Sequence, residues 1–372
     1  MRANNVLGLV FANVDDSVLS EVTGVRSMAS VPFGGGYRLI DFVLSNMVNA
    51  GMTKVGVITN NNYQSLMDHI GGGKPWDLAR KNEGLYLLPP FNAQAIDNYN
   101  AGRIGALKNI MRFLERSTEE YVLLTDCTYV VNLDFNDIFK YHQETEADIT
   151  ILCQKGKLPV LDSVLVVDKR DDERITKLHM GDTSGKKAEY CLKCAVMKKS
   201  LLERLVNDAF AKGHSSFEKE VFLKNVSKLK INGYKVDAFC PVIDSLESYY
   251  EANFSLLDVN NYKQLFNTER PVYTKVYEDM PVVYGLESCV KSSLVADGSV
   301  IDGTVENCII FRDCHIEKGA VVKNSILMPH SFVGENAKLN YCITDKGVSV
   351  RSGKNLSGAD SFPVYIGKNI HI

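Results

Sequence analysis

The sequence lacks any hydrophobic run long enough to cross a membrane. The longest apolar stretch near the start, residues 6–12, is interrupted by Gly8 and gives way to Asn13 and two aspartates. It is too short for the core of a signal peptide and far too short for a transmembrane helix. These absences predict a cytoplasmic protein without a membrane partner.

Concentrated positive charge is also missing. Lys and Arg number 42 against 45 Asp and Glu, so the formal net charge is −3, and no basic run stands out. A nucleic-acid surface usually carries a concentrated basic stripe, so we expect no nucleic-acid partner. The nine cysteines are odd in number, scattered and without an export signal. They predict reduced thiols in the cytoplasm rather than a disulfide framework.

What remains is the composition of an ordinary globular protein. Hydrophobic residues make up 45% and charged residues 23% of the 372 residues, which excludes a disordered or collagen-like chain. At roughly 150 residues per domain, this length predicts two domains or three.

The first half of the chain alternates between strand and helix patterns. Buried strands are expected at residues 6–11, 55–59, 121–125, 149–153, 164–167, 191–197 and 235–239. Apolar residues at helical spacing follow Arg38, and a second helical pattern covers residues 104–114. Gly51 lies where a left-handed residue would end the first of these helices. This order predicts an α/β fold with a mostly parallel sheet, helices on both faces, and ligands at the carboxyl ends of the strands.

The pattern changes near residue 286, where short apolar pairs alternate with Gly, Asp, Asn and Ser. Steps of six separate Leu294 from Val300, link Ile310, Ile316, Val322 and Met328, and link Leu327, Val333 and Leu339. This period is typical of a left-handed parallel β-helix, in which each hexad forms one face of a triangular coil. A meander of antiparallel strands is the alternative. We therefore expect an α/β domain at residues 1–244, a linker with a helix at 245–285, and a β-helix at 286–372.

Residues 31–46 point to a family. They read VPFGGGYRLIDFVLSN, which resembles the PFGGxYRLIDFxLSN signature of glucose-1-phosphate adenylyltransferase, also called ADP-glucose pyrophosphorylase. Residues 48–52 and 55–59 are similar to the segments that follow in that family. The resemblance covers nearly the whole chain, and it implies a Rossmann-like nucleotidyltransferase domain followed by a hexapeptide β-helix.

In that family the phosphate of glucose 1-phosphate attacks the α-phosphorus of ATP, and pyrophosphate leaves. The reaction needs a backbone cradle for the triphosphate, cationic side chains, and Mg²⁺ held by carboxylates. The family's glycine-rich cradle, AGGxGxRL, corresponds here to ANVDDSVL at residues 12–19. Asn13, Val14 and Asp16 replace the three glycines, and Val18 replaces the arginine. Side chains and negative charge in this loop predict that the cradle is absent.

The cationic and metal-binding positions are also depleted. The family's KRAKP segment corresponds to residues 25–29, so Arg26 is retained while Met28 stands at a lysine position, as does the valine before Arg26. Of the two metal-binding aspartates, Asp126 is retained and Val242 replaces the other. One carboxylate alone holds Mg²⁺ weakly, and Asp244 is a shifted alternative. We expect no functional catalytic set and no metal, with Asp126 a lone weak candidate.

The sugar site differs in the same way. The family's FxEKP hairpin, which holds glucose 1-phosphate, corresponds to LHMGD at residues 178–182, and its GTADAV helix start corresponds to GRIGAL at residues 102–107. Arg103 is expected either on a phosphate at the helix start or, in preference, at the surface. The candidates for residual ligand binding are Arg26, Arg38, Gly102 and Arg103.

All these losses lie at the mouth of the site, whereas the strands, the helix after Arg38 and the β-helix pattern persist. This combination resembles the non-catalytic, GlgD-type subunit that some Gram-positive bacteria pair with a catalytic subunit. The resemblance implies a regulatory partner in a heterotetramer, with no cofactor of its own and with Mg²⁺ and ATP at the catalytic subunit. It also implies assembly through the helix of residues 38–50 and the β-helix. Two alternatives stay open: an enzyme active alone through Asp126 and Arg26, and a subunit that binds a sugar phosphate as an effector.

Overall fold

The computed structural model describes residues 1–13, 16–90, 93–100, 102–161, 164–170, 173–181 and 186–372. The α-helices in this part of the chain are α1 (Ser20–Thr23), α2 (Leu39–Asn49), α3 (Gln64–Ile70), α4 (Ala93–Asn100), α5 (Arg103–Asn109), α6 (Met111–Arg116), α7 (Phe135–Glu144), α8 (Lys199–Ala211), α9 (Leu246–Phe254) and α10 (Val259–Leu265). The strands of the N-terminal domain are β1 (Val6–Phe11), β2 (Pro32–Phe33), β3 (Tyr37–Arg38), β4 (Lys54–Ile58), β5 (Gly84–Leu88), β6 (Tyr121–Asp126), β7 (Ile149–Lys157), β8 (Leu165–Lys169), β9 (Ile175–Met180), β10 (Lys187–Lys198) and β11 (Ile231–Lys235).

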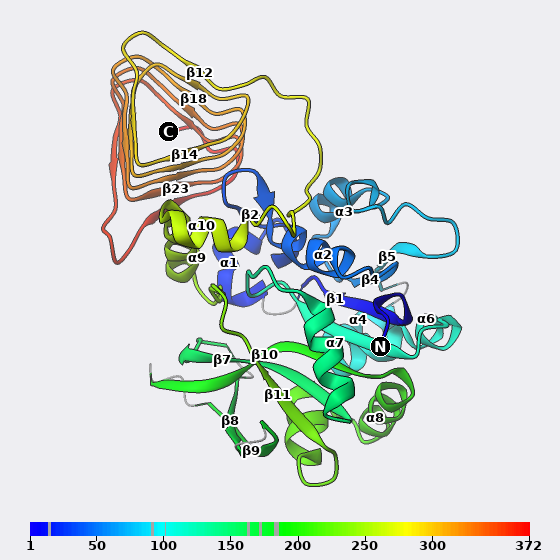
Figure 1. Ribbon diagram of the computed structural model, residues 1–372. Helices are drawn as coiled ribbons and strands as arrows, with labels where there is room; N and C mark the ends of the chain where they lie inside the picture. The colour runs from blue at the N-terminus through cyan, green and yellow to red at the C-terminus, as the bar shows by residue number, and fades with distance from the viewer. Residues whose placement is uncertain (14–15, 91–92, 101, 162–163, 171–172, 182–185) are drawn as a thin grey trace.

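The N-terminal domain is built on one mixed sheet (Figure 1). Its strands run in the order β11-β7-β10-β6-β1-β4-β5, and the hairpin β8–β9 attaches to β10. β1 is parallel to β4 and β6, whereas β10 is antiparallel to β6 and β7. Val6 and Val10 of β1 pack with α2 and α7, and Leu7 and Leu9 pack with α5, α6 and α8. The prediction of an α/β fold with helices on both faces of the sheet is confirmed.

Two local predictions are wrong in detail. The strand expected at 235–239 is β11, which ends at Lys235 because its parallel pairing with β7, from Ile231 opposite Ile149, fixes its position. The apolar side chain of Val236 is buried, yet it lies just beyond that pairing. The helical pattern of residues 104–114 is divided at Ile110, whose backbone leaves the α-helical region between α5 and α6.

The C-terminal part is a parallel β-helix of the hexapeptide type, seen as a stacked triangle in Figure 1. Its first face contains β12 (Val283–Tyr284), β15 (Val300–Ile301), β18 (His315–Ile316), β21 (Phe332–Val333) and β24 (Ser349–Val350). The second contains β13 (Cys289–Lys291), β16 (Thr304–Glu306), β19 (Val321–Lys323), β22 (Lys338–Asn340) and β25 (Asn355–Ser357). The third contains β14 (Leu294–Val295), β17 (Ile309–Ile310), β20 (Ile326–Leu327), β23 (Cys342–Thr344) and β26 (Val364–Ile366). The predicted β-helix is confirmed, and its first strand begins at Val283, before the residue 286 expected from the sequence.

From Thr304 onward a coil takes 17 residues, because Thr304 pairs with Val321 and Val321 pairs with Lys338, whereas Cys289 pairs with Thr304 only 15 residues later. Three strict hexads would require about 18 residues, so one face of each 17-residue coil is shorter by a residue. Met328 shows the consequence: the six-residue count placed it inside the coil, but its side chain packs in the core of the N-terminal domain. The true interior residue at this face is Leu327.

The two domains share one hydrophobic core, with α9 between them (Figure 1). Tyr249 of α9 donates a hydrogen bond to the carbonyl oxygen of Pro32 (2.7 Å), and Tyr250 donates to that of Asn324 in the β-helix (2.7 Å). Phe311 of the β-helix is buried in the same core. The relative position of the domains is therefore fixed by packing.

The chain returns from α10 to the first coil through residues 266–282, which we call the strap. The strap runs along α2: Tyr273 N–H donates to Ser45 Oγ (2.8 Å), and Thr274 Oγ1 donates to Asp41 Oδ2 (2.6 Å). Every residue from Leu39 to Met47 is buried. The helix that the resemblance implied for subunit contacts is thus covered by the chain's own strap and core.

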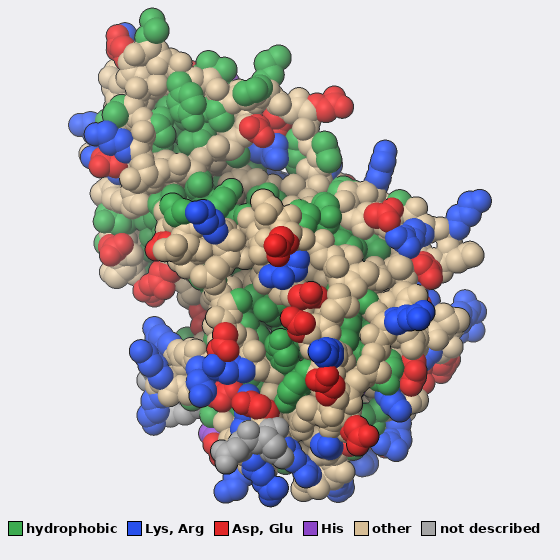
Figure 2. All heavy atoms as spheres, in the orientation of Figure 1, with side chains coloured by type: hydrophobic (Ala, Val, Ile, Leu, Met, Phe, Trp, Pro, Cys, Tyr) green, Lys and Arg blue, Asp and Glu red, His purple; other side chains and the backbone are tan. Residues whose placement is uncertain are grey.

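The surface of the first coil is different. Hydrophobic side chains are visible within the triangular outline of the β-helix (Figure 2), and Val283, Tyr284 and Leu286 of the first coil are exposed, as is Met280 of the strap. Within the described ranges, no helix is both long enough and apolar enough to span a bilayer.

Candidate functional site

The loop after β1 holds the position of the family's phosphate cradle, and it is closed by its own side chains. Asn13 accepts a hydrogen bond from the backbone N–H of Asn60 (2.9 Å) and donates to the carbonyl oxygen of Asn61 (3.0 Å) and to Asp16 (2.8 Å). Val14 and the residue after it lie outside the described residues. The loop is therefore pinned to the segment that follows β4, through an amide at a former glycine position.

Asp16 supplies the negative charge at the centre of this loop. Its Oδ1 accepts from the backbone N–H of Met28 (2.9 Å), and its main-chain oxygen accepts from Thr23 Oγ1 (2.6 Å). This carboxylate accepts a backbone hydrogen bond of the kind that a bound phosphate oxygen would accept. Val18 and Met28 pack against the core. The replaced positions thus have structural partners.

The side chain of Arg26 does not face this loop but pairs with a residue of the β-helix. Its Nη2 lies 2.7 Å from Oδ1 and 2.9 Å from Oδ2 of Asp345, and both side chains are buried. Asp345 also accepts from Tyr365 Oη (2.6 Å) and from the N–H of Lys346 (2.6 Å). The guanidinium is only 2% exposed, so it joins the domains and leaves no open face for a phosphate.

The retained aspartate, Asp126, lies buried at the carboxyl end of β6, as its position in the sequence predicts. Its Oδ1 accepts from the N–H (3.1 Å) and the hydroxyl (2.8 Å) of Thr128. Val242 pairs with Tyr129 through an isolated β-bridge and packs against the core. Asp244 does not substitute for the lost ligand, since its Oδ2 accepts from the N–H of Val160 (2.6 Å).

Mg²⁺ prefers octahedral oxygen ligation. The two family positions supply one carboxylate between them, and in the part of the chain that the structure describes no cluster of three His, Cys, Asp or Glu side chains could hold a metal. The residues at this site do not fit a resident Mg²⁺.

Arg103 fills the opposite wall of the site, which corrects the expectation that it lies at the surface. It is only 9% exposed: its guanidinium stacks on Phe11, 4.3 Å from the ring centre, and Nη1 lies 2.5 Å from Glu218 Oε1. Burial opposes ionisation of Glu218, but the charge of Arg103 outweighs it and lowers the pKa of that carboxyl. Gly102 precedes it with φ +112°, and a Cβ there would lie 2.7 Å from the carbonyl oxygen of Ser215. This helix start is packed and paired.

The hairpin that corresponds to the family's sugar site supplies none of its charged groups. Leu178 of β9 is buried and His179 is exposed, while residue 182 lies outside the described residues. No Glu–Lys pair stands at residues 178–181.

A second site lies between the domains, and sequence reasoning missed most of it. It is a cavity of about 230 Å³ lined by cationic and polar side chains, among them Arg38, His69, Arg312, His330 and Lys346. Arg38, at the start of α2, donates to the carbonyl oxygen (2.6 Å) and the hydroxyl of Ser65. The 17-residue coil is the signal that could have found the rest, because Arg312 and Lys346 occupy the same corner two coils apart.

The cavity holds charges of both signs. Asp279 and Asp313 also line it, and they pair with Arg312 (3.1 Å) and His330 (2.6 Å), which leaves Arg38 and Lys346 as the cations available to an anion. Burial, together with the charges of Arg38 and Arg26, lowers the pKa of Lys346 to about 7. Burial also lowers the pKa of Arg38 and of His69, although Asp41 opposes the change at His69. Among the described residues, His69 Nδ1 and Arg312 Nε are buried nitrogens with no hydrogen-bond partner. An anion in the cavity would reduce the repulsion between Arg38 and Lys346.

The comparisons with known proteins agree with the two-domain architecture. A nucleotidyl transferase family model matches residues 17–177, and a model of the GlmU-like C-terminal hexapeptide region matches residues 283–361. The glycogen biosynthesis protein GlgD of Bacillus subtilis (strain 168) is 34% identical over 371 residues, covering 100% of this chain and 98% of the relative. The GlgD protein of Geobacillus stearothermophilus is 34% identical over 86% of this chain and 83% of its own length. A glucose-1-phosphate adenylyltransferase of Clostridium perfringens (strain SM101 / Type A) is 28% identical over 99% of this chain and 97% of its own length.

Proposed function

This chain belongs to the family of the glycogen biosynthesis protein GlgD and of glucose-1-phosphate adenylyltransferase. From that premise we propose that it is a regulatory, largely non-catalytic subunit of ADP-glucose pyrophosphorylase. The enzyme converts ATP and glucose 1-phosphate to ADP-glucose and pyrophosphate. In this proposal the chain acts in cytoplasmic glycogen synthesis by tuning a catalytic paralogue.

The observation that carries the proposal is the carboxylate of Asp16, bonded to the backbone N–H of Met28 inside the cradle loop. A triphosphate that approached this loop would meet the negative charge of Asp16, and the backbone N–H of Met28 would already be bonded to that carboxylate. Asp126 has no second carboxylate at Val242, and Arg26 is committed to Asp345. The cradle, a metal ligand and the cations are thus lost together. Because such groups act together in catalysis, losing all of them should remove the activity, and restoring one should not recover it. Mg²⁺ and ATP would bind at the catalytic partner.

The first coil of the β-helix is the surface we assign to that partner. Tyr284 and Leu286 are exposed on it beside Met280 of the strap. Large apolar side chains that face water favour burial against another protein. An obligate interface in a heterotetramer would bury about 2,000 Å² or more, with an apolar centre.

The cavity between the domains supports a second element of the proposal, a sugar-phosphate effector. Arg38 comes from the nucleotidyltransferase domain, and Arg312 and Lys346 come from the β-helix. A phosphate held between them would contact both domains, so its binding free energy could shift the equilibrium between two arrangements of the subunits.

The test is an activity assay of the isolated chain with ATP, glucose 1-phosphate and Mg²⁺, repeated after mixing with the catalytic paralogue. We expect negligible turnover alone, co-sedimentation at micromolar concentration, and a higher kcat or substrate affinity for the mixture. Leu286→Asp should weaken association, whereas Val259→Asp, at an exposed apolar position on α10, should leave it unchanged. Turnover of the pure chain at the rate of a catalytic family member would establish instead the alternative, an enzyme with an altered site.

A further inference from the structure

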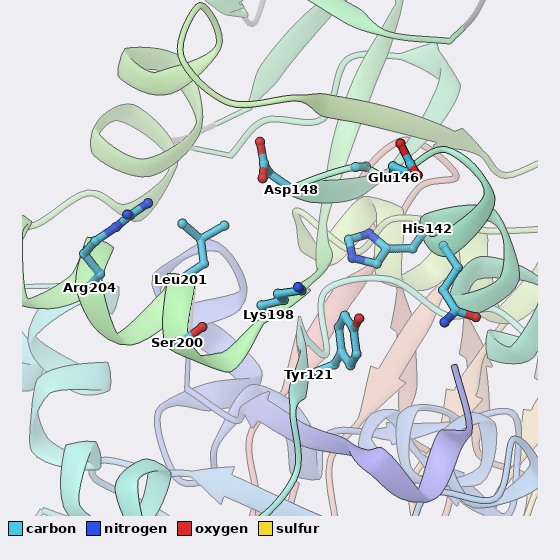
Figure 3. A pocket seen from close by; sticks show the side chains of 10 residues that line it. Tyr121, His142, Glu146, Asp148, Lys198, Ser200, Leu201 and Arg204 are labelled. Carbon is cyan, nitrogen blue, oxygen red and sulfur yellow. The ribbon is translucent and has the colours of Figure 1, made fainter.

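A further cavity lies far from the site discussed above. It has a volume of about 650 Å³ and opens between the turn that follows α7 and the start of α8 (Figure 3). Tyr121, in its wall, begins β6, whereas Asp126 ends the same strand. The cavity is therefore at the amino end of β6, across the sheet from the family's reaction site. Its volume falls in the range of ligand sites.

Two oppositely charged walls face each other across this cavity. Glu146 and Asp148 form one, and Lys198 and Arg204 form the other, as Figure 3 shows. All four side chains are exposed, and among the described residues no ion pair joins one wall to the other. The result is an open groove with donors on one side and acceptors on the other, although Asp148 Oδ2 already accepts from the backbone N–H of Lys230 (2.8 Å).

The start of α8 adds further donors, although the backbone N–H of Lys199 already donates to the carbonyl oxygen of Glu120 (2.8 Å). This 13-residue helix begins after Lys198, has no side-chain cap and carries no acidic residue in its first turn. The first N–H groups of a helix need partners outside the helix. Ser200 lies at this end and lines the groove, so its hydroxyl can both donate and accept.

His142 is the buried polar group aimed into the groove. It is only 3% exposed, and its Nδ1 lies 2.8 Å from Thr150 Oγ1. Its ring points toward the space between Lys198 and Tyr121 (Figure 3). Burial lowers the pKa of His142 to about 4, so the ring is neutral at pH 7 and presents Nε2 without adding charge.

We propose that this groove binds a neutral, polyhydroxylated chain, that is, an oligosaccharide. Two carboxylates and two cations line it, so their charges nearly cancel, and neither an anion nor a cation gains a net attraction. A sugar hydroxyl donates and accepts at once and can bond to both walls. Tyr121 and Leu201, both half-buried, offer apolar contact for the faces of sugar rings.

An α-1,4-linked glucan is the oligosaccharide that we expect, and this choice rests on the proposed role in glycogen synthesis. Because most of the lining is exposed, the groove suits a chain that passes over the surface better than a small enclosed molecule. The isolated chain can be tested without its catalytic partner, so failure of this inference is distinguishable from failure of the proposed function.

The experiment is isothermal titration of the full-length chain with maltoheptaose, with cellohexaose and inorganic phosphate as comparison ligands. Maltoheptaose should bind; Ser200→Trp, which fills the groove, should abolish binding. Glu146→Ala and Arg204→Ala should each weaken it about tenfold. Asp208→Ala removes an exposed charge of the same helix outside the groove and should leave affinity unchanged.

Each other result has a defined meaning. Unchanged affinity in Ser200→Trp would place the glucan elsewhere and overturn the assignment, as would the absence of oligosaccharide binding. Phosphate binding that Arg204→Ala weakens and Glu146→Ala strengthens would identify an anion site instead. Binding of cellohexaose but not maltoheptaose would support the oligosaccharide groove and separate it from glycogen.

Discussion

Replacing Arg26 with alanine tests whether the ion pair to Asp345 holds the two domains together. The substitution leaves the carboxylate of Asp345 buried, with the hydroxyl of Tyr365 and the N–H of Lys346 as its remaining donors. Removing one partner of a buried ion pair costs about 3–5 kcal/mol. Since a folded protein is stable by only about 5–15 kcal/mol, the loss should be large.

The assay is equilibrium unfolding in urea, followed by circular dichroism. The matched control is Arg80→Ala, which breaks a pair with Asp77 whose side chains are 41% and 89% exposed. Exposed pairs contribute about 0–1 kcal/mol, so this control should unfold nearly as the parent does. The double variant Arg26→Met with Asp345→Leu removes both charges and should recover much of the lost stability. If Arg26→Ala unfolds at the same urea concentration as Arg80→Ala, the pair does not hold the domains and the reasoning is wrong.

Three further predictions concern single side chains. Asp16→Gly should not restore turnover in the activity assay, because the lost cations and metal ligand remain absent; recovery of family-like turnover would contradict the account of the loop. The pKa of Lys346 is lowered to about 7, so the folded state binds fewer protons than the unfolded state above that pH, and stability gains from this group between pH 7 and about 8.5. In urea unfolding, the free energy of unfolding of Lys346→Met should rise less between pH 7 and about 8.5 than that of the parent. If the free energy rises equally with pH in both proteins, this prediction is wrong. The pKa of His142 is lowered to about 4, so up to about 3 kcal/mol of stability should be lost as pH falls from 6.5 to 4, and His142→Gln should flatten that acid limb.

The parts of the fold that the sequence revealed are those decided locally. β1 is a short apolar run buried on both faces, and α2 is a helical pattern that ends before Gly51. Both follow from periodicity alone. The coils of the β-helix were visible for the same reason, but the short face that moves Met328 out of the interior was not, because pairing between successive coils sets it.

In the candidate site too, the sequence revealed the residues that a local pattern identifies and not their distant partners. Matching the signature located Asp16, Asp126 and Val242, since each lies in a segment that can be aligned with the family. It could not show that Arg26 turns away to Asp345 or that Arg103 stacks on Phe11. Those partners are distant in sequence, and only the packed structure brings them together.

The pairing of Arg26 with Asp345 also sets an order of events during synthesis. The two residues are 319 positions apart, and translation proceeds at about 5–20 residues per second. For roughly 15–60 seconds the nascent N-terminal domain therefore carries a guanidinium whose carboxylate has not yet been made. Because the partners of Arg26 are residues of the β-helix, its guanidinium faces water until the last coils cover it. The ion pair therefore acts only after the whole chain has been made, as the contact that closes the two domains on each other.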